Sequence, residues 1–266
     1  MHKSDSGNDE RESVVLGNGV VATTNSVDQL EQTFDAVRRM KAESFGKRRR
    51  ERRQVEAIAK LLNKGDMFID VGGFVGNFTA HMVAAKKCRA VLFEPVSGHC
   101  EFCRRRFAGN NAVTVEQLGL SDRSEEIDIF RGHRNLAWNT MIPEVTNRRN
   151  RLLPSEKTRC VTFDDYRAEN KVGRVDCVKI DVEGYEWRVL RGMRQTIAEC
   201  LPHIECELHY GMEHPNSQQQ NEEFDYLHEL GYRGFDIRSA LNGQGKRHHL
   251  HVLLHRPLRR FRKRIS

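Results

Sequence analysis

The sequence has no apolar run approaching the roughly 18 residues that a membrane-spanning helix needs. Residues 1–13 are polar and acidic and lack the apolar core of a secretory signal peptide, so the sequence does not predict export by that route. No internal repeat is present, and the seven cysteines are an odd number in a chain too long to need disulfides for stability. These absences together predict reduced thiols and a cytoplasmic location.

The composition is that of a folded protein with two basic segments. Hydrophobic residues make up 38% of the 266-residue chain, which is enough for a sizeable core and excludes wholesale disorder or a collagen-like structure. The net charge of +7 is concentrated in two runs: 47–53 carries +5 and 256–264 carries +6, which leaves −4 on the rest of the chain. Basic runs of this kind are more typical of solvated faces or tails than of a binding groove, so nucleic acid is not the favoured partner.

Short apolar runs alternate with helical patterns along most of the chain. This alternation predicts an α/β fold with a mostly parallel sheet, helices on both faces and an antiparallel strand pair at the C-terminal end. We expect a flexible polar arm over 1–26, N-terminal helices over 27–65, one main domain over 66–256 and a basic tail over 257–266. The expected strands are 67–71, 90–93, 113–117, 127–130, 175–180, 203–208, 232–237 and 250–255, and the expected helices are 77–87, 96–107, 185–199 and 218–230.

The strongest chemical signal is a glycine-rich turn between the first strand of the main domain and its helix. It contains Gly72, Gly73 and Gly76 and leads into Asn77. Glycines let the backbone turn tightly near a ligand, and the helix start offers free N–H groups. Asp70 precedes the first glycine by two residues and would repel the pyrophosphate of NAD, but it suits the positively charged end of S-adenosylmethionine (SAM).

Acidic residues lie at or near the carboxyl ends of three other strands of the predicted sheet. Glu94 ends the second strand, where a carboxylate can accept hydrogen bonds from both ribose hydroxyls of NAD or SAM. Asp181 ends the buried strand 175–180, where it can orient a cofactor or take a proton from a nucleophile. Glu207 and His209 share one face of the strand 203–208 and its end, and we interpret them as solvated polar residues, as a substrate base, or with Asp181 as ligands of a divalent cation.

Two further features have weaker patterns. Cys100 and Cys103 have the spacing of zinc ligands, but no second close cysteine pair completes a tetrahedral site, so no metal is predicted there. The irregular segment 130–154 contains His133 and Trp138 and is either a lid over a substrate or a surface loop.

An ordered set of motifs over residues 50–237 resembles the FkbM-type family of SAM-dependent methyltransferases. The motifs are FIDVG at 68–72, GNFT at 76–79, FEP at 93–95, LSD at 120–122, TFDD at 162–165, KIDVEGYEW at 179–187 and LRG at 190–192. The resemblance implies a Rossmann-like methyltransferase domain over 66–256. Where members of the family commonly have a small residue and then Asn, this chain has Gly73 and Phe74.

The resemblance also implies roles for individual residues. Asp70, the three glycines and Asn77 form the cofactor loop, Glu94 binds the ribose, Leu120 and Ser121 border the adenine, and Asp181 lies near the methyl group. The catalytic candidates are Asp181, Glu207 and His209, and SAM is the expected cofactor, with a divalent cation not favoured.

The expected reaction is O-methylation of a hydroxyl on a sugar, glycan or natural-product acceptor. A nucleic-acid methyltransferase is one alternative, although the sequence has neither an Asn- or Asp-Pro-Pro-Tyr motif nor a Pro-Cys nucleophile. A non-catalytic interaction protein that keeps the fold is the other, because Phe74 departs from the family pattern.

Overall fold

A computed structural model describes residues 13–15, 21–23, 54–132, 139–142, 152–209, 217–239 and 249–255. Residues 27–53 of the expected N-terminal helices lie outside this set, as do both basic runs, His133 and Trp138. In the range expected to be a polar arm, β1 (Ser13–Val15) and β2 (Val21–Thr23) form an antiparallel pair. Within the expected N-terminal helices, residues 54–59 are helical, and Val55, Ile58 and Leu62 are buried.

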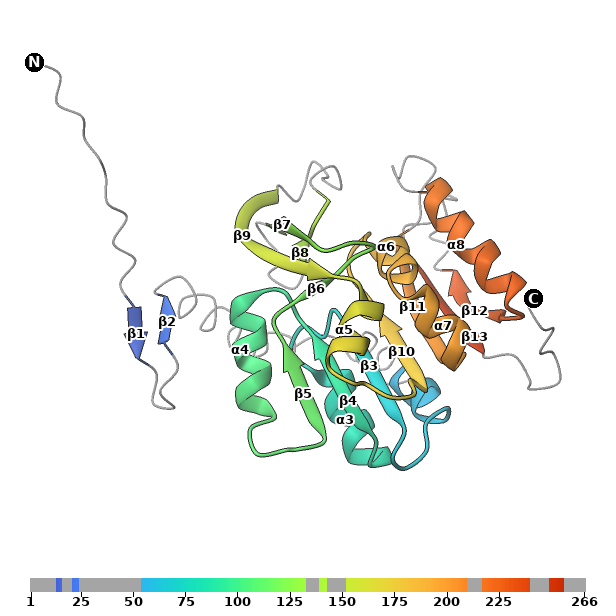
Figure 1. The fold of residues 1–266 in the computed structure, drawn as a ribbon, viewed down its shortest axis with the longest axis horizontal. Coiled ribbons are helices and arrows are strands. Elements are labelled where there is room, and N and C mark those ends of the chain that lie inside the picture. Colours follow the sequence, from blue (N-terminus) through green and yellow to red (C-terminus); the bar gives the residue numbers. More distant parts are fainter. Residues whose placement is uncertain are drawn as a thin grey trace, which may run out of the picture.

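The main sheet has seven strands in the order β12-β13-β11-β10-β3-β4-β5 (Figure 1). The five strands from β11 to β5 pair in parallel, and β13 runs antiparallel to both β11 and β12. The predicted α/β fold, with its antiparallel C-terminal pair, is therefore confirmed. The strands are β3 (Met67–Val71), β4 (Arg89–Phe93), β5 (Val113–Glu116), β10 (Cys177–Ile180), β11 (His203–His209), β12 (Arg233–Ser239) and β13 (His249–His255).

Hydrophobic cores lie on both faces of this sheet. Successive side chains of a strand point to opposite faces, and the neighbours Phe68 and Ile69 accordingly belong to different buried clusters. The cluster around Phe68 includes Met82 of α3, and the cluster around Ile69 includes Leu190 of α6 and Ile197 of α7. The helices are α3 (Asn77–Lys86), α4 (Ser97–Arg106), α5 (Phe163–Glu169), α6 (Glu186–Arg191), α7 (Arg194–Cys200) and α8 (Ser217–Glu229).

A second, four-stranded sheet includes described residues of the segment 130–154 and corrects the expectation that this segment is irregular. It has the order β6-β9-β7-β8, and the ten-residue β9 pairs antiparallel with β7 (Figure 1). Pro154 lies opposite Phe130 where the register shifts, which is a position at which a strand tolerates proline. The strand β9 was not predicted, because its proline and its charged residues do not fit the apolar pattern of a strand. The strands are β6 (Gly119–Leu120), β7 (Glu125–Gly132), β8 (Asn139–Thr140) and β9 (Leu152–Val161).

The single helix predicted over 185–199 is two helices, α6 and α7, with a break at Gly192 and Met193. A Cβ at Gly192 would lie 1.9 Å from the carbonyl oxygen of Ser121, so the chain packs there in a way that only glycine permits. The short α5 was not predicted, although the Thr162 hydroxyl caps it by accepting a hydrogen bond from the N–H of Asp165 at 3.0 Å.

The buried carboxylate of Glu223 links helix α8 to α6 and α7 by hydrogen bonds. The Glu223 side chain is 1% exposed and accepts hydrogen bonds from Arg191 Nε at 2.8 Å and from Arg194 Nε and Nη2 at 2.9 and 2.8 Å. The two guanidinium groups are partly exposed to solvent, whereas the Glu223 carboxylate is buried. The carboxylate is therefore the group that most needs the hydrogen bonds between them.

We expect Glu223→Gln to lower the free energy of unfolding by about 2 kcal/mol, because hydrogen bonds to charged groups are worth roughly that much and the amide repels one donor. Urea unfolding measures the change. The control is Glu222→Gln, since Glu222 is 51% exposed and its ion pair with Arg191 is expected to contribute less than about 1 kcal/mol. An equal loss in both variants would contradict this assignment.

Within the described residues, no helix is both long and apolar enough to span a membrane.

Candidate active site

The glycine loop joins the carboxyl end of β3 to α3. Gly72 and Gly73 both donate their N–H groups to the carbonyl of Phe93, at 3.0 and 3.1 Å, which ties the loop to the end of β4. Gly72 and Gly76 have φ values of +73° and +72°. The neighbouring protein atoms themselves require glycine: a Cβ at Gly72 would lie 2.0 Å from the carbonyl oxygen of Asp181, and one at Gly73 would lie 2.4 Å from Leu92 Cγ. Close packing of the loop on the sheet therefore explains these glycines without a ligand.

The carboxylate of Asp70 is turned into the protein. Its side chain is fully buried, and Oδ2 accepts hydrogen bonds from the N–H and the hydroxyl of Thr79 at 3.3 and 2.7 Å. Oδ1 lies 3.5 Å from Nζ of Lys179. The sequence predicted that this carboxylate would face the cofactor, but here it holds the first turn of α3 against β3.

Lys179 is a buried charged residue at this site to which the sequence analysis assigned no role. Its side chain is 3% exposed, and Nζ donates a hydrogen bond to the carbonyl of Gly72 at 2.8 Å. The same ammonium lies 3.4 Å from Oδ2 of Asp181 and 5.4 Å from the ring centre of Phe78. A lysine inside an otherwise apolar buried strand was the available signal, because a buried charge has to be paired.

The charge of Lys179 is maintained by its neighbours. Burial disfavours the ammonium and by itself lowers the pKa of Lys179, but the surrounding carboxylates outweigh burial and raise that pKa above its ordinary value. The carboxylates are, in order of effect, those of Asp181, Asp70, Glu205 and Glu207.

Glu94 closes the other side of the loop. Its Oε2 accepts the N–H of Phe74 at 2.8 Å and its Oε1 accepts the N–H of Val96 at 3.0 Å, and the residue is 5% exposed. His99 lies beside it, with Nδ1 3.5 Å from Oε1. The carboxylate thus holds the glycine loop and the turn after β4 together.

Phe74 occupies the position where the family pattern commonly has Asn. Its φ is +49°, a left-handed conformation that costs a bulky residue about 1–2 kcal/mol. The surroundings over-determine this conformation: the ring packs edge-on against His99 with centroids 4.6 Å apart, and the Cys103 thiol donates to the Phe74 carbonyl at 3.2 Å. Asn would adopt the same φ with less strain.

Asp181 is the most accessible of the acids around the loop, with 31% of its side chain exposed. Its N–H donates to the Val71 carbonyl at 3.1 Å, which continues the pairing of β10 with β3. The turn that follows has positive φ at Glu183 and Gly184, and Thr140 of β8 donates its hydroxyl to the Glu183 carbonyl at 2.9 Å. The second sheet therefore contacts the edge of the main sheet where Asp181 lies.

The remaining predicted residues lie at varied positions. Asn77 starts α3 and accepts a hydrogen bond from Arg106 at 2.8 Å. Leu120 and Ser121 are buried, and their place beside an adenine stays a prediction. Glu207 is partly exposed on β11, and His209, whose backbone alone is described, ends that strand.

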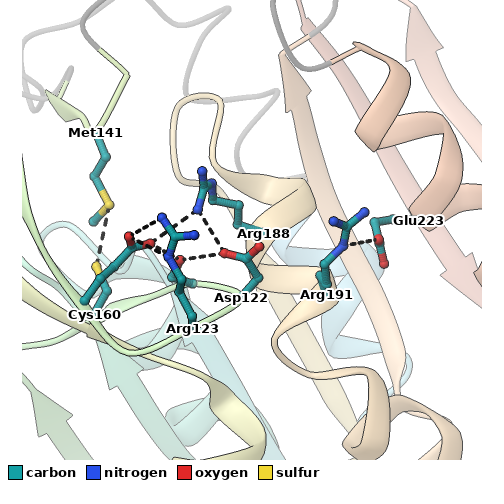
Figure 2. A network of polar contacts seen from close by, with 9 residues as sticks. Asp122, Arg123, Met141, Cys160, Arg188, Arg191 and Glu223 are labelled. Carbon is teal, nitrogen blue, oxygen red and sulfur yellow. Dashed lines mark hydrogen bonds and ion pairs between the residues drawn. The ribbon is translucent and has the colours of Figure 1, made fainter.

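Ser121 belongs to a polar network that joins the second sheet to α6. Its hydroxyl donates to Glu125 at 2.9 Å, and Arg188 forms ion pairs with Asp122 at 2.9 Å and with Glu125 at 3.3 Å (Figure 2). The guanidinium of Arg188 also lies over the ring of Trp187, 4.9 Å from its centre. This network fixes α6, and with it the turn after Asp181, relative to the second sheet.

No group of side chains suited to hold a metal ion occurs in the part of the chain that the structure describes. Cys100 and Cys103 are buried free thiols, as are the other five cysteines. Burial raises the pKa of Cys100 to about 12, so the thiolate that zinc would need is disfavoured there.

The sequence matches one family model, that of the methyltransferase FkbM domain, over residues 70–233. No curated protein is similar enough to count as a match.

Solved structures of low sequence identity resemble parts of this chain. The crystal structure of methyltransferase FkbM from Methylobacillus flagellatus KT is 14% identical with a TM-score of 0.48, and the match covers 74% of this chain and 50% of that one. This chain thus spans about half the length of that protein. A putative rRNA-methylase from Clostridium thermocellum is 11% identical with a TM-score of 0.48, covering 77% and 94%. Fibrillarin from Aeropyrum pernix, solved with natively bound S-adenosyl-L-methionine, is 11% identical with a TM-score of 0.41, covering 72% and 68%.

Proposed function

The chain belongs to the FkbM methyltransferase family, and we propose that it transfers the methyl group of SAM to a hydroxyl of a small-molecule or glycan acceptor. The family membership supports methyl transfer in general, and the acidic residues around the glycine loop support SAM as the donor. The choice of a hydroxyl acceptor rests on the family resemblance.

The residues at the carboxyl edge of the sheet suit a positively charged ligand. The described carboxylates there include those of Asp70, Glu94, Asp181 and Glu207, and the ammonium of Lys179 contacts those of Asp70 and Asp181. A net negative site favours a ligand that carries a sulfonium and an ammonium. This excess of negative charge beside a partly exposed Asp181 is the observation that carries the proposal.

Each residue then has a defined task. SAM, when bound, supplies an electrophilic methyl group. Glu94 has lone pairs left after accepting two backbone N–H groups, and these can accept ribose hydroxyls. Asp181 takes the proton of the acceptor hydroxyl at its exposed carboxylate, and Glu207 and His209 of β11 are further candidates for that base. No metal is part of the proposal.

Isothermal calorimetry with SAM tests the cofactor site. We expect the wild-type protein to bind SAM and Glu94→Gln to bind at least about tenfold more weakly, because the amide loses charge-assisted hydrogen bonds and presents a donor to a backbone N–H. The matched control is Glu126→Gln, since that side chain is 66% exposed on β7. Thermal unfolding without ligand checks that both variants are folded.

Two outcomes would change the proposal. Unaltered SAM affinity in Glu94→Gln would refute the ribose assignment alone. Absence of SAM binding by the wild-type protein would refute the cofactor and favour the non-catalytic alternative.

A further inference from the structure

A row of charged side chains crosses the interior of the main sheet beneath the candidate site. In the strand register Lys179 of β10 pairs with Asp70 of β3 on one side and with Glu205 of β11 on the other. Paired residues of neighbouring parallel strands project to the same face. All three side chains are nearly inaccessible, with 0% exposure for Asp70 and Glu205 and 3% for Lys179.

Lys179 is the cation of this row, and its ammonium lies between the glycine loop and the partly exposed Asp181. Its Nζ contacts the Gly72 carbonyl, Oδ1 of Asp70 and Oδ2 of Asp181, at 2.8, 3.5 and 3.4 Å. Packing alone does not require an ammonium here, because an apolar side chain would fill the space without the cost of desolvating a charge. The positive charge of Lys179 therefore offsets part of the negative charge at the partly exposed carboxylate of Asp181.

The charge at this edge affects the affinity of the site for SAM relative to its product, S-adenosylhomocysteine (SAH). SAM carries a sulfonium, whereas SAH has a neutral thioether and is otherwise the same molecule without the methyl group. A strongly negative site would favour SAM over SAH steeply, and a compensating cation reduces that preference.

We propose that Lys179 is a positioning residue that holds Asp181 and the Gly72 carbonyl in place and limits the preference of the site for sulfonium over thioether. The proposal rests on the proposed SAM-dependent function. It assigns to Lys179 no contact with the reacting atoms, since the ammonium is buried behind Asp181 and the glycine loop.

The test measures the dissociation constants of SAM and SAH for the wild-type protein and for Lys179→Met, which keeps an apolar stem of similar length. We expect the ratio of the SAH constant to the SAM constant to rise at least about tenfold, the effect of one unit charge within about 12 Å at an effective dielectric constant near 20. The exposed Lys157→Met on β9 is the control and should leave the ratio unchanged.

If Lys179 only maintained the shape of the site, Lys179→Met would weaken the binding of SAM and of SAH in the same proportion. An unchanged ratio in Lys179→Met would therefore overturn the proposal. If wild-type protein binds neither ligand, the proposed function fails instead.

A second variant keeps the proposal testable if Lys179→Met does not fold. Glu205→Gln preserves shape and removes one negative charge on the far side of the lysine, so the ratio should fall by severalfold. A ratio that rises or stays constant in this variant would contradict the electrostatic role.

Discussion

Gly72→Ala is expected to lower the free energy of unfolding by about 2–5 kcal/mol and to abolish SAM binding. The new Cβ would lie 2.0 Å from the Asp181 carbonyl oxygen and 3.0 Å from its carbon. The φ of +73° adds about 1–2 kcal/mol of backbone strain for a residue with a side chain, and forcing the two segments apart adds about 1–3 kcal/mol. Urea unfolding monitored by circular dichroism gives the stability, and calorimetry gives the binding.

Two other glycines separate these contributions. Gly109 has a φ of +77° but no atom within 4 Å of an added Cβ, so Gly109→Ala should cost only the strain, about 1 kcal/mol. Gly192 has an ordinary φ of −73° but a Cβ contact of 1.9 Å, so Gly192→Ala should cost only the steric contribution. Equal losses for Gly72→Ala and Gly109→Ala would show that the close approach to Asp181 is not what demands glycine at the loop.

Asp181→Asn is expected to reduce methyl transfer by about 100-fold or more while changing SAM affinity less than about tenfold. Removal of a general base commonly costs 10²–10⁴ in rate, and the amide keeps the shape of the side chain and the backbone pairing with Val71. Transfer of a radiolabelled methyl group from SAM to acceptors in a cell extract measures the reaction. Calorimetry on the same preparation measures the affinity.

The control for this variant is Asp128→Asn on the exposed side of β7. It makes the same chemical change away from the site and should leave transfer unaltered. Transfer by Asp181→Asn at the wild-type rate would remove Asp181 from the reaction and leave Glu207 and His209 as the candidate bases. Parallel losses of affinity and transfer would instead assign Asp181 to cofactor binding.

The elements whose own residues fix them were predicted well, and the elements that depend on distant parts of the chain were not. The strands 67–71 and 203–208 and the helices 77–87 and 96–107 were predicted within two residues of their observed bounds, because each has an apolar pattern of its own. The strand β9 was missed, because its order comes from pairing with β7 and its own residues include a proline and several charges.

The break between α6 and α7 has a similar origin. The apolar periodicity of 185–199 does not predict it, because a distant side chain binds the first N–H groups of α7: Gln195 and Thr196 donate theirs to the Asp164 carboxylate, at 2.9 and 2.8 Å.

The sequence by itself determined the α/β architecture, the family and the sheet edge at which Asp70, Glu94 and Asp181 gather, because strand patterns and strand ends are local properties. Only the tertiary structure decided which way these carboxylates face. Asp70 turns inward because Thr79 and Lys179 meet it there, and Lys179 comes from a strand more than a hundred residues further along the chain. Hydrogen bonds and charge pairs between distant segments leave no periodic trace in a sequence, so the orientation of the site's charges had to be observed.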